Sequence, residues 1–249
     1  MTIRQSWVFS PDEFAWLWSD AGLDRYLDPI AIIETAATAD EYHQLVQAHS
    51  VRFPRGAVDD PRPALRAIAE ANIRITASGR IHRTSDRVRS IAAATPGLNV
   101  IVTQNSSTDP DFGGDVRLAV VPRGDLLRYF SLTLPAAAAG RAEQMVGYTP
   151  RIRGEAEPSS WRVAADGRSP VEERIRALLR LPRSAEGAFR IDHSRSTQPT
   201  YISWVDVADG YRATGRYLIT VNETGTDTVV LPAGIETIAA ELRRRLQPA

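Results

Sequence analysis

Residues 201–246 read YISWVDVADGYRATGRYLITVNETGTDTVVLPAGIETIAAELRRRL, and this stretch decides the fold. Apolar and polar residues alternate in runs that begin at residues 201, 217 and 229, with glycine-containing turns between them. A period of two with β-branched and aromatic residues predicts three β-strands. After Pro232, the apolar residues recur at helical spacing, at Ile235, Ile238, Ala239, Leu242 and Leu246. The end of the chain is therefore a strand meander covered by a helix, which is an α+β unit.

A similar arrangement is expected earlier in the chain. Four alternating runs at residues 73–81, 87–95, 99–105 and 115–121 are punctuated by Gly79, Pro96-Gly97 and Gly113-Gly114. Their short connections predict antiparallel strands. Capping boxes predict helices after Ser10 and Thr38, and apolar spacing predicts others near residues 65–69 and 126–130. We also expect a strand at residues 29–35.

The second half of the chain begins at Pro135. We expect an alanine-rich helix from there to about Val146, a mobile polar segment at 147–169, a helix after Pro170, and then four strands and the final helix. Residues 1–134 and 135–249 thus repeat one order of elements. We predict a single α+β domain, 1–249, built of two similar halves around a central, mainly antiparallel sheet with pseudo-twofold symmetry.

The composition excludes several classes of protein. The net charge is zero, with 30 basic and 30 acidic residues, so there is no basic footprint for nucleic acid. There is no cysteine, which rules out disulfides and thiolate chemistry. No apolar run reaches the ~18–20 residues of a membrane span, and the N-terminus lacks the apolar core of a signal peptide. We therefore expect a cytoplasmic protein without a membrane span.

No catalytic, cofactor-binding or metal-binding motif is evident. The four histidines lack the spacing of a zinc helix, and GxSxG, GxxxxGK[ST] and GxGxxG are all absent from the sequence. We therefore predict a binding protein with no cofactor. The alternative is a hydrolase or transferase of unrecognised type that uses Asp, His and Arg. A deep pocket with convergent titratable groups would favour that alternative.

The connection at residues 79–89 is the candidate partner-binding site. It gathers charge around one apolar side chain, without any sign in the sequence of an internal partner elsewhere in the chain. The residues are Arg80, Ile81, His82, Arg83, Asp86, Arg87 and Arg89. One interpretation is an exposed binding loop on a rigid scaffold. The other is a solvated hairpin tip.

Several motifs give the chain a family resemblance. They are S-W-x-D at 203–206, G-R-Y at 215–217, V-L-P-A at 230–233, S-P-D-E-F-A-W-L-W at 10–18 and G-D-V-R-L-A-V at 114–120. Together they resemble the EspG family, cytosolic chaperones of actinobacterial type VII (ESX) secretion systems.

The resemblance implies a central sheet flanked by two helical subdomains and a client that is a PE–PPE heterodimer. It also implies that the chaperone caps the apolar tip of this helical client, and that a loop such as 79–89 meets it. The oligomeric state stays open, with a homodimer as one alternative.

Overall fold

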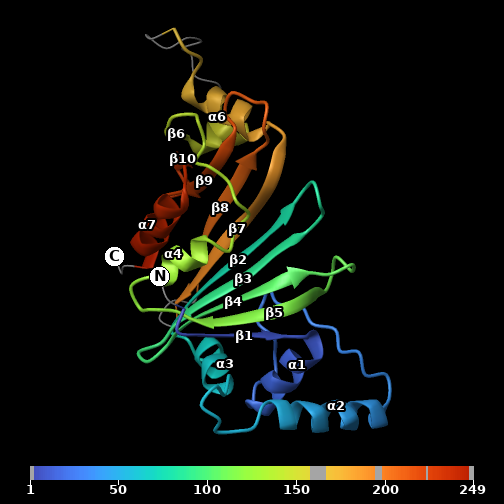
Figure 1. The fold of residues 1–249 in the computed structure, drawn as a ribbon. Coiled ribbons are helices and arrows are strands. Elements are labelled where there is room, and N and C mark those ends of the chain that lie inside the picture. The colour runs from blue at the N-terminus through green and yellow to red at the C-terminus, as the bar shows by residue number, and fades with distance from the viewer. Residues whose placement is uncertain (1–2, 158–166, 194–197, 223, 247–249) are drawn as a thin grey trace.

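The protein folds around one continuous antiparallel sheet (Figure 1). A computed structural model describes residues 3–157, 167–193, 198–222 and 224–246. In this part of the chain the strand order is β1-β5-β4-β3-β2-β7-β8-β9-β10-β6. The strands are β1 (Gln5–Phe9), β2 (Ile73–Ile81), β3 (Arg87–Ala94), β4 (Asn99–Ser106), β5 (Gly113–Val120), β6 (Met145–Tyr148), β7 (Arg183–His193), β8 (Thr200–Val207), β9 (Gly215–Val221) and β10 (Asp227–Pro232).

The strand order runs outward in the same way on both sides of the sheet centre. β2 pairs with β7 in the middle, β2–β5 lie on one side and β7–β10 on the other. The edges are the short strands β1 and β6, which each precede a helix in the sequence. The eight longer strands confirm the predicted runs, whereas β1 and β6 were not predicted as strands.

The helices cover the two faces of the sheet differently. They are α1 (Pro11–Asp20), α2 (Ala39–Arg52), α3 (Arg62–Ala69), α4 (Leu126–Ser131), α5 (Thr149–Arg153), α6 (Val171–Leu179) and α7 (Ile235–Leu246). On one face, α4 and α7 pack together over the middle of the sheet. On the other face, α1 and α3 cover one end, and α5 and α6 cover the opposite end. The predicted α+β architecture is confirmed, with capping boxes at Ser10 and Thr38.

Two predicted elements are wrong. Residues 29–35 form no strand. Ala31 hydrogen-bonds to the Gln104 side chain, and its carbonyl accepts from the N–H of Gly113, the first residue of β5, so the segment makes no ladder of strand hydrogen bonds. The helix predicted from Pro135 to about Val146 is absent. Residues 135–144 bond to β9, with the Gly140 N–H donating to the Arg216 carbonyl at 2.9 Å, and Met145 and Val146 begin β6. Of the segment expected to be mobile, residues 147–157 contain part of β6 and α5, and residues 158–166 lie outside the described residues.

The motifs at 203–206 and 215–217 have structural roles at the centre of the sheet. The Trp204 ring lies over Gly79 and Gly187, which face each other on β2 and β7; a Cβ at either glycine would come within 2.7 Å of that ring. Asp206 and Arg216 form a buried bidentate ion pair, with Oδ–N distances of 2.6 Å. The Arg216 guanidinium also lies over the Trp204 ring. These residues fix the junction between the two sets of strands.

Candidate functional site

The predicted binding loop is the hairpin between β2 and β3. Its turn is closed by a hydrogen bond from the Ile81 N–H to the Asp86 carbonyl, at 2.8 Å. Arg80 and Ile81 belong to β2, and Arg87 and Arg89 belong to β3. The exposed members are Arg80, His82, Arg83 and Arg87, whereas Ile81 and Asp86 are half-buried and Arg89 is buried. The hairpin therefore presents most, but not all, of the predicted residues to solvent.

Two of these residues have an internal partner that the sequence did not reveal. The Glu186 carboxylate on β7 accepts from Arg80 at 3.0 Å, contacts His82 Nε2 at 3.1 Å and also pairs with Arg183. Burial alone would raise the pKa of Glu186, but the hydrogen bonds from Arg80 and Arg183 lower it overall. Glu186 is thus ionised at neutral pH and anchors the base of the hairpin to the second half of the sheet.

Arg89 lies beneath the surface rather than on it. Only 8% of the residue is exposed, and its Nη2 donates to the Pro110 carbonyl at 3.0 Å. Its Nη1 has no hydrogen-bond partner in the described part of the chain. Burial lowers the pKa of Arg89. Arg89 therefore contributes a positive charge close to the hairpin but cannot itself be an exposed anchor.

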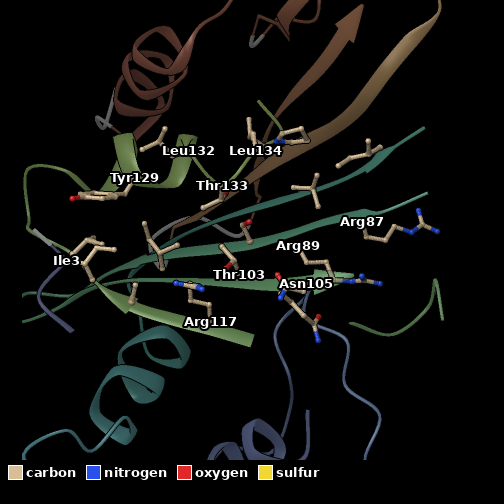
Figure 2. A pocket seen from close by; sticks show the side chains of 18 residues that line it. Ile3, Arg87, Arg89, Thr103, Asn105, Arg117, Tyr129, Leu132, Thr133 and Leu134 are labelled. Atoms are coloured by element: carbon tan, nitrogen blue, oxygen red, sulfur yellow. The ribbon is translucent and has the colours of Figure 1, made fainter. Parts of the chain in front are cut away.

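A groove of about 470 Å³ runs from the hairpin across the face of the sheet that carries α4 (Figure 2). Val88, Ile101, Ala119 and Val121 form its apolar floor on β3, β4 and the end of β5. Across from the strands, the second wall is α4 and the chain that follows it, with Tyr129, Leu132 and Leu134. Ile81 and Arg87 of the hairpin also line it. We call this the β3–β5 groove.

The open rim of the β3–β5 groove carries exposed apolar side chains. Ile3 and Leu132 line the groove and are 44% and 45% exposed. Val8 is 46% exposed and lies on β1 opposite Arg117 of β5, which also lines the groove. Large apolar side chains that gather on one exposed surface mark an interaction site. Sequence reasoning missed Leu132 and Arg117, although the alternation in β5 gave a local signal for the direction of Arg117.

A second opening, of about 580 Å³, lies on the opposite side of the hairpin base. It is lined by Asp28, Ser78, Arg80 and Glu186, among others, and a neighbouring opening contains Arg190 and Asp192. Glu186 pairs with Arg80, and Asp192 pairs with Arg190 at 2.8 Å. Within residues 3–157, 167–193, 198–222 and 224–246, no group of three or more His, Asp or Glu residues is placed to hold a metal ion. These ion-paired groups act as surface salt bridges and favour no particular reaction.

Comparisons with known proteins bear on the whole fold. The sequence profile of the EspG family matches residues 10–244. The chain belongs to the EspG family. It is also similar to a solved structure of the Mycobacterium tuberculosis type VII secretion system chaperone EspG5 in complex with a PE25–PPE41 dimer. That likeness has a TM-score of 0.62 at 12% identity, and it covers 96% of this chain and 95% of EspG5.

The match to EspG5 supports the same fold for this EspG-family chain, with the sheet between helices at both ends. Among curated proteins, the sequence search finds no significant match. In the described residues of this family member, no helix has the length and apolarity that a bilayer crossing requires.

Proposed function

We propose that this EspG-family chain is a cytosolic chaperone of a type VII secretion system that binds a PE–PPE heterodimer, and that its role is binding rather than catalysis. The observation that carries the proposal is the β3–β5 groove, an open apolar channel that ends at the hairpin. The fold similarity to EspG5, which was solved with a PE25–PPE41 dimer, supports the class of client.

Capping is the mechanism that we propose. An exposed apolar tip on a helical client favours self-association, because burial of apolar surface contributes roughly 25 cal/mol per Å². The floor of the groove offers apolar side chains that are already held in place by the sheet, such as Ile101 and Val121. A client tip in this groove would bury its apolar residues against Leu132 and Ile3 instead of against another client. The covered client would stay soluble until it is delivered for secretion.

The hairpin would meet the client at one end of the groove. Ile81 lines the groove and packs against the main core cluster, while Arg83 and Arg87 are exposed. Apolar anchors with a charged rim are usual in protein interfaces. In this arrangement Ile81 supplies apolar contact, and the arginines set the orientation and the association rate.

The direct test is coexpression with the PE–PPE pairs encoded by the same organism, followed by copurification and calorimetry. We expect a stable complex with at least one pair. Leu132→Ser in the groove should weaken it at least about fivefold, since buried interface anchors contribute about 1 kcal/mol or more. Val51→Ser on α2 is the matched control, because Val51 is also exposed, at 82%, and lies outside the groove. Equal affinities for both variants would place the client elsewhere.

The hairpin is tested separately. We would replace Arg83 and Arg87 with Ala together, and Ile81 with Ser in a second variant. Both changes should weaken client binding with the fold intact, as judged by thermal melts; hairpin tips usually tolerate change. Wild-type affinity in both variants with unchanged melts would mean that the hairpin is only a solvated turn.

A further inference from the structure

The guanidinium of Arg117 projects into the β3–β5 groove (Figure 2), among apolar side chains and neutral polar ones such as Thr103 and Thr133. Arg87 and Arg89 border the groove through β3, but their side chains alternate with Val88 and so lie on the opposite face of the sheet; no Asp or Glu lines the groove. Across the residues that the structure describes, none of these three guanidinium groups is ion-paired with a carboxylate. This differs from Arg62 and Arg216, which are buried and paired with acids. The Arg117 charge is thus not balanced by a carboxylate in the groove lining.

Arg117 forms no ion pair with a carboxylate among the described residues. Its register partners are Val8 on β1 and Thr103 on β4, both neutral. Asp115 is two residues earlier on the same strand and therefore on the same face, but it is exposed, lies outside the groove lining and forms no described ion pair with Arg117. The Arg117 side chain projects into the groove from the strand side, across from Tyr129 and Leu132 (Figure 2).

Arg87 lies at the hairpin end of β3, with its side chain on the face that carries Arg80 and Glu186 rather than on the groove face. Its backbone N–H donates to the Ser106 hydroxyl at 2.9 Å, which fixes the strand, whereas its guanidinium has no described partner. The neighbouring Arg80 on β2 donates to Glu186, and Glu186 also pairs with Arg183. This acid is therefore already occupied by other cations. The buried charge of Arg89 lies between the hairpin and the loop at 110–111. The charge that faces the groove is therefore that of Arg117 (Figure 2).

These observations point to the chemistry of the bound segment. A guanidinium is weakly hydrated and presents its N–H groups in a planar fork that matches a carboxylate. Beside an apolar floor that excludes water, such a pair is stronger than on an open surface. We propose, resting on the proposed function, that the client segment in this groove carries an Asp or Glu side chain next to its apolar anchor, and that Arg117 binds this carboxylate. Clients with a neutral or basic tip are disfavoured, because they leave the Arg117 guanidinium desolvated without a partner.

The test uses the PE–PPE pair that copurifies with the wild-type chaperone. Arg117→Gln should weaken binding about three- to tenfold, and Arg117→Glu more than tenfold with a slower association rate, as expected for an interfacial charge. The affinity of the wild type should fall as salt rises from low to physiological concentration, and that dependence should become shallower in Arg117→Gln. Arg25→Gln is the control: Arg25 is also exposed and lies in the loop after α1, on the other face of the sheet.

The decisive experiment reverses charges on both the client and the chaperone. Each Asp and Glu at the client tip is replaced in turn by Arg, and each client variant is measured against wild type and Arg117→Glu. Recovery of affinity for one reversed pair, while that client variant binds the wild type poorly, supports the inference. If Arg117→Gln and Arg117→Glu bind every client as the wild type does, carboxylate recognition by Arg117 is wrong, although the chaperone proposal stands. If no PE–PPE pair binds the wild type, the proposed function itself fails.

Discussion

Removal of the Asp206 charge should strongly destabilise the protein. Both partners of the ion pair are almost completely buried, with 4% of the Asp206 side chain and 3% of the Arg216 side chain exposed. Arg216 also donates to the Pro135 carbonyl at 2.7 Å, so its guanidinium is held in place even when the acid is neutralised. In Asp206→Asn the buried cation loses its counter-charge and cannot reach water. Loss of one partner of a buried pair typically costs about 3–5 kcal/mol.

The assay is urea denaturation followed by circular dichroism, with stability read from the midpoint at an unchanged slope. The matched control is Asp192→Asn, because the Arg190–Asp192 pair has the same kind of contact but is 46% and 30% exposed. That variant should lose at most about 1 kcal/mol. If Asp206→Asn and Asp192→Asn lower the midpoint equally, the argument that burial makes the Asp206 pair structurally important is wrong.

Further predictions concern the helix cover, the sheet centre and the acid stability. Leu242→Ala removes a fully buried side chain of α7 and should cost about 2–5 kcal/mol, seen as a lower thermal midpoint. Gly187→Ala places a Cβ 2.1 Å from a β2 carbonyl oxygen and should cost about 1–3 kcal/mol or more in the same measurement. Burial would raise the pKa of Asp20, but hydrogen bonds from Arg55 and Arg62 lower it; its stabilisation is therefore complete at neutral pH and is lost below about pH 4. Asp20→Asn should flatten this part of a plot of thermal midpoint against pH.

The sequence predicted those elements whose signal is local. β2–β5 and β7–β10 follow from alternation, and α7 follows from its apolar stripe. The failures have non-local causes. Residues 135–144 are alanine-rich and suit a helix, yet their hydrogen bonds go to β9, and a Cβ at Gly140 would lie 2.1 Å from the Tyr217 ring. Edge strands such as β6 are too short to show a clear period.

The same distinction between local and non-local signals applies to the candidate site. The hairpin could be found from its turn and its charge, because both are properties of consecutive residues. Its anchor could not be found, because Glu186 is 106 residues from Arg80 in the sequence. The β3–β5 groove was missed for a similar reason: Ile3, Arg117 and Leu132 come from three separate segments that only the fold brings together.

The β3–β5 groove exists because helices of different length cover the two halves of the sheet. From the central pair of β2 and β7, the strands of residues 1–134 and those of residues 135–249 run outward in the same order. The covering helices are unequal, because α7 spans 12 residues and α4 only 6. The short α4 leaves the outer strands of the first half open on this face. An open face in one half and a covered face in the other give the same type of residue two different environments.

Two arginines on this face show the consequence. Arg216 on β9 is buried and paired with Asp206, whereas Arg117 on β5 is exposed and without an ion pair among the described residues. The first guanidinium stabilises the sheet, and the second is available to a partner. Substitution of Arg216 should therefore lower stability and client binding together, because the groove depends on the fold. Substitution of Arg117 should lower binding while the free energy of unfolding stays within about 0.5 kcal/mol of the wild type, as is usual for an exposed side chain.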